Sequence, residues 1–379
     1  MQISAAPIYD HSFTRGDFLR LGGLAFGLAF SLFLPQDAAA KSLSRFSGQR
    51  VHPADVAAYL STMSTLGEVV HGRVLEASIP VYDIPSTKGT KVQTYWRDRI
   101  LLITDVTLCS DPLDTSHNRV WYRIGDEGYA HSGSIQPVRT FHNPVIEEIP
   151  EGGTLAEVTV PFTDARWKLG SNQPVAYRFY YETTYWVIRK VQDEAGEPWY
   201  VVLDDKWEYT YYVQATHLRI LPEEELSPLS PQIHPLFKRV DVHLPEQVLI
   251  AYEYDEPVFM TRVATGAKFS DGNYETPTGR RVIFHKRPSR HMARGNLAAN
   301  GYDLPGVPWN SYITEEGIAF HGTYWHNNYG RPRSHGCINL SPRAAKWLYR
   351  WTLPVVPADQ QAAYEYDGTM VDIIGDELF

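Results

Sequence analysis

Cysteine is scarce in this sequence of 379 residues, which contains only Cys109 and Cys337. Scaffolds held together by disulfides are shorter and richer in cysteine, so we expect other interactions to stabilise this fold. Clustered lysine and arginine are also missing, and the formal net charge is −9. Because nucleic-acid binders usually present a basic face, we expect no nucleic-acid partner.

The sequence also lacks an apolar run long enough to form a membrane-spanning helix. The run from Leu21 to Leu34 is shorter than the ~20 residues that a span requires. It follows a basic stretch and precedes the small residues 38–40, as in an export signal. We therefore predict an export signal in residues 1–40, transient contact with the membrane through it, and a location in the cell envelope.

The segment around Arg15 resembles a twin-arginine export signal, with Gly16 where the second arginine belongs. Both export routes therefore stay open. After it, apolar residues at helical spacing between Val56 and Leu66 predict a short lead-in helix in residues 41–66.

Aromatic and turn-forming residues are abundant, with 24 Tyr, 10 Trp, 27 Gly and 26 Pro. This composition favours many short strands joined by turns, so we predict a mainly β fold. Residues 120–124 (VWYRI) are followed by Gly128-Tyr129, a pattern that resembles bacterial SH3-like domains. Residues 198–202 (PWYVV) echo it. We predict an SH3-like, small β-barrel module in residues 67–145 and a second β module in residues 155–221. An SH3-like type for the second module, and one larger β domain in place of the two, both stay open.

The C-terminal third is predicted to be a separate domain. Four prolines in residues 222–235 predict a stiff, extended linker before it. Within residues 236–376, alternating apolar residues such as Val240 and Val242 indicate strands. Ser341 followed by Pro342 predicts the start of a short C-terminal helix.

Two short motifs in this domain have the residue types needed for acyl transfer. They are Phe320-His321-Gly322-Thr323 and Ser334-His335-Gly336-Cys337-Ile338-Asn339. A thiol becomes a good nucleophile when a nearby imidazole takes its proton or an imidazolium lowers its pKa. Backbone N–H groups at Gly336 and Cys337 are candidates for stabilising the oxyanion of a tetrahedral intermediate.

Together these motifs resemble the signature of the L,D-transpeptidase (YkuD-like) catalytic domain, over about residues 240–374. The resemblance implies a β-rich domain that acts on peptidoglycan stem peptides through a thioester, without metal or cofactor. It implies the following roles: Cys337 as nucleophile, His321 as proton donor and acceptor, His335 and Gly336 beside the nucleophile, and Asn339, Ser334 and Gly322 near the substrate. The Gly322 carbonyl is expected to orient the His321 ring. Arg331 and Arg333 are further candidates for binding stem-peptide carboxylates.

Several alternatives stay open from the sequence alone. Either His321 or His335 could be the base. His321, His326, His335 and Cys337 are also zinc-ligand types, although their spacings do not form the compact pairs of a structural site. Water as acceptor would make the protein an L,D-carboxypeptidase. A Cys–His cell-wall endopeptidase and a non-enzymatic wall-binding protein are the remaining alternatives.

Overall fold

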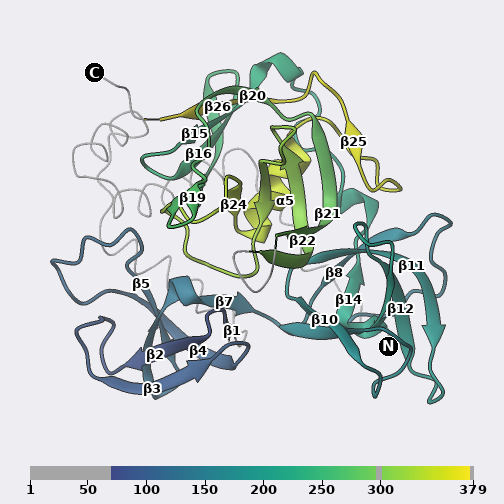
Figure 1. Cartoon of the computed structure of the whole chain (residues 1–379), viewed down its shortest axis with the longest axis horizontal. Helices are drawn as coiled ribbons and strands as arrows, with labels where there is room; N and C mark the ends of the chain where they lie inside the picture. Colours follow the sequence, from purple (N-terminus) through teal and green to yellow (C-terminus); the bar gives the residue numbers. More distant parts are fainter. Residues whose placement is uncertain (1–69, 296–300, 376–379) are drawn as a thin grey trace, which may run out of the picture. The chain divides into compact units, whose positions relative to one another are not determined.

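The computed structural model describes residues 70–295 and 301–375, which belong to one compact unit, Val69–Phe379. Most elements in this part are strands, and its α-helix lies near the C-terminus (Figure 1). The prediction of a mainly β protein with a short C-terminal helix is therefore confirmed. The predicted export signal and lead-in helix lie outside the described residues. None of the helices described is long and apolar enough to cross a membrane.

The first sheet has seven strands in the order β3-β2-β6-β5-β4-β1-β7. A single 3-10 turn, η2, lies between its last two strands along the chain. Its elements are β1 (Val70–Val74), β2 (Ser78–Tyr82), β3 (Lys91–Trp96), β4 (Ile100–Leu108), β5 (Val120–Ile124), β6 (Gly128–His131), η2 (Ser132–Ser134) and β7 (Ile135–Val138).

The second sheet repeats this arrangement, strand for strand, in the order β10-β9-β13-β12-β11-β8-β14. Its turn η3 takes the place of η2. Its elements are β8 (Thr154–Val158), β9 (Phe162–Arg166), β10 (Val175–Tyr180), β11 (Thr184–Gln192), β12 (Pro198–Leu203), β13 (Thr210–Gln214), η3 (Ala215–His217) and β14 (Leu218–Ile220).

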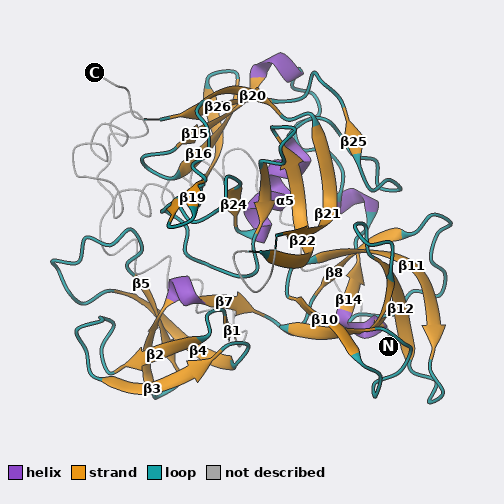
Figure 2. Cartoon of the chain, viewed as in Figure 1, coloured by secondary structure: helices purple, strands orange, loops and turns teal. Residues whose placement is uncertain are grey.

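The two tryptophan motifs that suggested a repeat occupy matching strands. Trp121 is buried in β5 and Trp199 is buried in β12. The end strands β3 and β7, like β10 and β14, are not paired with each other in the described part of the chain, so neither sheet closes into a barrel (Figure 2). The SH3-like identity of the two sheets stays a prediction.

The C-terminal region contains two five-stranded sheets, β17-β16-β15-β26-β20 and β24-β23-β22-β21-β25, and the small pair β18-β19. Its elements are β15 (Lys238–His243), β16 (Val248–Glu253), β17 (Glu256–Arg262), β18 (Lys268–Phe269), β19 (Gly272–Asn273), β20 (Gly279–Val282), β21 (His285–Arg294), β22 (Tyr302–Tyr312), β23 (Ala319–Gly322), β24 (Ile338–Leu340), α5 (Pro342–Trp351), β25 (Ala363–Tyr364) and β26 (Met370–Ile374).

The helix α5 starts where the sequence predicts. The Ser341 side chain accepts a hydrogen bond from the Ala344 N–H at 3.3 Å, and Pro342 occupies the first helical position. This cap satisfies one of the N–H groups that the first turn leaves unpaired. Leu348 and Trp351 are buried, so the helix packs one apolar face against the β-sheets.

One buried cluster joins the second sheet to the C-terminal region. Leu155 and Trp186 come from the second sheet, while Val240, Trp309 and Phe320 come from C-terminal strands. All five are at most 3% exposed. These sequence segments therefore share a hydrophobic core, and burial of this area stabilises them together.

The proline-rich segment 222–235 differs from the extended linker predicted from its sequence. Its first part forms the 3-10 turn η4 (Glu223–Glu225), and a second turn, η5 (Pro235–Phe237), follows it. The Glu225 carboxylate lies 2.7 Å from the Lys346 ammonium of α5, and the Leu229 N–H donates to the Arg350 carbonyl at 2.9 Å. Contacts with the helix therefore hold the segment in place, which proline content alone does not predict.

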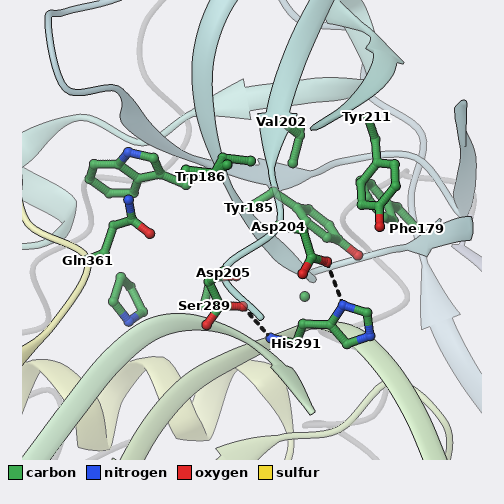
Figure 3. Close-up of a pocket in the computed structure, with 13 residues that line it drawn as sticks. Phe179, Tyr185, Trp186, Val202, Asp204, Asp205, Tyr211, Ser289, His291 and Gln361 are labelled. Carbon is green, nitrogen blue, oxygen red and sulfur yellow. Dashed lines mark hydrogen bonds and ion pairs between the residues drawn. The ribbon is translucent and has the colours of Figure 1, made fainter. Parts of the chain in front are cut away.

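A charged histidine also connects the second sheet to β21. His291 is 2% exposed, and its ring lies between the carboxylates of Asp204 and Asp303. His291 and Asp204 are in the wall of a small pocket (Figure 3). The Nδ1–Asp204 distance is 2.5 Å. Burial lowers the pKa of His291, but hydrogen bonds and charge from Asp204 and Asp303 outweigh it, so the net shift is upward. A ring that donates to two carboxylates must carry both protons.

This arrangement predicts that the protein loses stability as the pH rises. Because the pKa of folded His291 is raised, its contribution is complete below about pH 6.5 and disappears as the pH rises through the folded value. The pKa of Asp204 is lowered in the folded protein, so its contribution to the free energy of unfolding is lost only as the pH falls below about 4. Replacing His291 with glutamine should flatten the alkaline decline, which we expect to be of the order of 1 kcal/mol.

Urea unfolding followed by tryptophan fluorescence between pH 6 and 9 measures this decline. The exposed His142 offers a matched control, since His142→Gln should keep the wild-type slope. Equal slopes in the wild type and His291→Gln would show that this ion pair does not control the pH dependence.

Candidate active site

Two parallel strands bring residues of the two sequence motifs, 320–323 and 334–339, together. The strands β23 and β24 pair with His321 opposite Asn339. Paired residues of parallel strands share a face of the sheet, and side chains two residues apart on an extended strand also share it. Cys337 lies two residues before Asn339. Cys337 itself lies directly before β24, so the register places His321 and Asn339 on one face of the sheet and Cys337 next to the strand that carries Asn339.

The His321 ring is buried and held by the next residue in the chain. Its Nδ1 lies 3.1 Å from the Gly322 carbonyl oxygen, the contact that the sequence predicts. A carbonyl can only accept, so Nδ1 carries the proton and Nε2 is left as the basic nitrogen. Burial lowers the pKa of His321 to about 4, with a smaller opposite effect from Gly322. At neutral pH the imidazole is therefore uncharged and able to accept a proton.

The Cys337 thiol is protonated in this state. Burial raises its pKa to about 11, and a hydrogen bond from the Ala319 backbone lowers it by less. Its Sγ donates to the Gly317 carbonyl at 3.7 Å. The sequence suggested a thiol whose pKa an imidazolium lowers. The structure instead has a neutral thiol on a half-buried residue and a neutral imidazole that is fully buried, because loss of hydration disfavours the charged form of each group.

Hydrogen bonds fix the turn that precedes the thiol. Ser334 Oγ donates to the Cys337 carbonyl at 2.5 Å and accepts from the Gly336 N–H at 3.1 Å. Gly336 has a φ of 115°, a conformation that side chains disfavour. Its N–H is thus already paired with Ser334, so it is not a free oxyanion donor in this state, unlike the role that the sequence suggested.

Thr276 supports this turn from another loop, a role that sequence reasoning missed. Its hydroxyl donates to the Gly336 carbonyl at 2.8 Å and accepts from the Gly266 N–H at 2.9 Å. The side chain is buried, with 3% exposure. Only the fold shows this contact, because Thr276 lies 60 positions before Gly336 in the chain.

His335 differs from His321 in its surroundings. Its side chain is exposed and stacks on the Phe269 ring, with centroids 4.6 Å apart and planes 9° apart. Tyr274 contacts the ring from another side at 4.6 Å. His335 therefore forms part of an aromatic wall, and the buried His321 is the better placed of the two to act as a base.

The two candidate arginines lie at the edge of the site. Arg331 is exposed, while Arg333 is half-buried with its guanidinium 3.8 Å from the Glu76 carboxylate. The Arg333 N–H donates to the Thr265 carbonyl at 2.7 Å. Arg333 thus has a partial counter-charge in this structure, and Arg331 is the more accessible group for a carboxylate.

Tyr302 and Tyr312 of β22 interact electrostatically with Cys337, and nothing in the sequence indicated this. Burial raises the pKa of Tyr312 to about 12, the charge of Arg290 lowers it by less, and a thiolate at Cys337 would raise it further. The pKa of Tyr302 is raised by burial and by Cys337 as well. The alternation of apolar and polar residues along a strand does not show which of them lie near a residue of another strand. The sequence therefore could not identify these two tyrosines.

His326 and Asn339 are buried side chains that contact each other. The His326 Nε2 lies 2.9 Å from the Asn339 side-chain nitrogen, and both residues are 3% exposed. Burial and the nearby charges of Arg333, His321 and Arg331 lower the pKa of His326 to about 3. Among the residues that the structure describes, no group of three or more His, Cys, Asp or Glu could hold a metal ion.

Comparison with known proteins identifies the region that contains this site. Residues 238–373 match the family profile of the L,D-transpeptidase catalytic domain, YkuD. The prediction of this domain from the two motifs is therefore confirmed. No curated protein matches the chain.

Solved structures with similarity to the chain include three L,D-transpeptidases. The one from Xylanimonas cellulosilytica is 24% identical, covers 36% of this chain and 60% of its own, and has a TM-score of 0.26. The catalytic domain from E. faecium is 23% identical, with coverages of 36% and 96% and a TM-score of 0.28. The one from Stackebrandtia nassauensis is 22% identical, with coverages of 41% and 62% and a TM-score of 0.27. At such TM-scores the superpositions support no inference about function.

Proposed function

We propose, from the L,D-transpeptidase domain match at residues 238–373, that this chain is an exported peptidoglycan L,D-transpeptidase with a cysteine nucleophile. One observation supports the chemistry most directly. The parallel register of β23 and β24 puts His321 opposite Asn339, two residues from Cys337, inside the matched region. The substrate class is the stem peptide of peptidoglycan, and the site of action is the cell wall outside the cytoplasm.

The proposed reaction has two acyl-transfer steps. In the first, Cys337 Sγ attacks the carbonyl before the terminal D-residue of a tetrapeptide stem, and its proton passes to His321 Nε2. The C–N bond then breaks, the departing amine takes that proton, and a thioester remains. In the second step an amine of another stem attacks the thioester carbonyl and gives a proton to His321 Nε2. The C–S bond then breaks as the cross-link forms, and this proton returns to Cys337 Sγ.

The neutral state of both groups shapes this proposal. Since the pKa of the thiol is raised and that of His321 is lowered, proton transfer must accompany attack on the bound carbonyl. Asn339 and the exposed Arg331 are proposed to contact the stem, and His335 to line the cleft with Phe269.

Incubation of the full chain with purified tetrapeptide stems and mass spectrometry of the products tests the proposal. We expect loss of the terminal D-residue and appearance of a dimer joined between two diamino-acid residues. A product shortened by one residue without a dimer would indicate a carboxypeptidase. Cleavage inside the stem would indicate an endopeptidase, and an unchanged substrate would contradict the proposal.

A further inference from the structure

The loop that joins the two catalytic motifs is attached to the first sheet. Asn327 lies in this loop, between His321 and Cys337. Its side-chain amide donates to the carbonyls of Ser132 at 3.3 Å and Ile135 at 3.0 Å, and its backbone N–H donates to the Gly133 carbonyl at 3.2 Å. One turn of the first sheet thus provides three hydrogen-bond acceptors for a single loop residue.

A buried arginine of β1 contacts the same loop nearer to His321. Arg73 is 3% exposed, and its guanidinium donates to the Tyr324 carbonyl. The same group lies 3.0 Å from the Asp98 carboxylate and 2.8 Å from the Gln136 side-chain oxygen. Because its other donors are committed within the first sheet, the guanidinium fixes the position of the loop relative to that sheet.

A third set of contacts continues from the first sheet to the catalytic strand. His117 Nε2 donates to the Asn328 side-chain oxygen at 2.7 Å, and the Asn328 N–H donates to His326 Nδ1 at 3.4 Å. Since Nδ1 accepts, the neutral His326 ring carries its proton on Nε2, which lies 2.9 Å from the Asn339 side-chain amide and donates to it through the otherwise unpaired amide oxygen. Asn339 pairs with His321 across β23 and β24. Side chains, together with the backbone N–H of Asn328, thus connect His117, outside the matched domain, to the strand that carries Asn339.

Burial of these polar groups restricts the orientations that they can adopt. Asn328 is 8% exposed, and His326 and Asn339 are each 3% exposed. A buried polar group that loses its partner is costly, so each group restricts the orientation of the next. The fit is also close in space, since a Cβ added to Gly133 would lie 2.8 Å from Asn328 Cγ.

We infer that the first sheet is a positioning element of the active site. His117, acting through Asn328 and His326, fixes the Asn339 amide on the strand face that carries His321. His117 touches neither the thiol nor the base, so it is a positioning residue and not a catalytic one. The inference rests on the proposed function for its kinetic consequence, but the hydrogen-bonded connection itself is independent of the substrate.

Three full-length variants test it. His117→Ala removes the donor to Asn328, whereas His117→Gln keeps an N–H donor at that end of the side chain. Glu127→Gln alters an exposed residue in the turn between β5 and β6 of the same sheet, which accepts a hydrogen bond from Tyr95, and it serves as the control. We expect His117→Ala to lower kcat for stem-peptide transfer about tenfold or more with KM within about twofold, because misplacement of reacting groups affects kcat. His117→Gln should recover most of the rate.

Nitrogen-15 NMR of the histidine rings provides a readout that needs no substrate. The His326 ring signals, assigned with His326→Gln, should shift in His117→Ala and return in His117→Gln. If the wild type does not act on stem peptides, the proposed function fails, while these signals still decide the connection. Unchanged His326 signals in folded His117→Ala would overturn the inference. So would an equal loss of kcat in Glu127→Gln, which would indicate general destabilisation of the sheet.

Discussion

Replacing Cys337 with alanine should abolish thioester formation and lower stem-peptide transfer by at least about 10⁴-fold, the range seen when a nucleophile is removed. The reason is that the other cysteine, Cys109, follows β4 in the first sheet, whereas Cys337 directly precedes β24. Mass spectrometry of the protein after brief incubation with stems measures the result. The wild type should gain the mass of the acyl group, and Cys337→Ala should not.

Cys109 provides the control for this experiment. It is also a free cysteine, buried at 7% exposure directly after β4 in the first sheet. Cys109→Ala should keep the acyl adduct and nearly the wild-type rate. An adduct that is absent from Cys109→Ala but present in Cys337→Ala would show that Cys109, and not Cys337, is the nucleophile.

Replacing His321 with alanine should lower kcat by about 10²- to 10⁴-fold and change KM little, the usual effect of losing a general base. The exposed His335 stacks on Phe269, so His335→Ala should produce the smaller loss. Steady-state kinetics on both variants distinguish the two histidines. The opposite ranking would make His335 the base.

The pH dependence of the wild type tests the same assignment without mutation. Burial lowers the pKa of His321 to about 4, so the neutral ring persists above that pH. The rate should therefore stay level from about pH 5 upward and decline only as the pH falls through about 4, where the ring gains a proton. An acid limb centred near pH 6.5, the ordinary value for histidine, would contradict a buried base.

The sequence predicted the local features of this protein well. The helix α5 begins at Ser341 because its cap and proline are encoded within two residues. The repeat was visible because Trp121 and Trp199 occupy the same strand of matching sheets. The motif around Cys337 indicated the catalytic domain. Each of these signals lies within a few neighbouring residues.

Features that depend on distant segments were not predictable. The raised pKa of the Cys337 thiol reflects burial by several strands, which no single stretch encodes. The contact between His117 and Asn328 joins residues 211 positions apart. Likewise, the proline-rich segment suggested a spacer, because the residues of α5 that hold it lie more than a hundred positions further along the chain.

The core that Leu155 and Trp186 share with Val240 and Phe320 has an evolutionary consequence. A domain joined to its neighbour only by a flexible linker can be exchanged between genes, because the two domains share no buried interface. Here recombination at the boundary near residue 236 would separate apolar side chains that bury one another. The segments on either side of that boundary are therefore expected to be inherited together and to accumulate compensating substitutions.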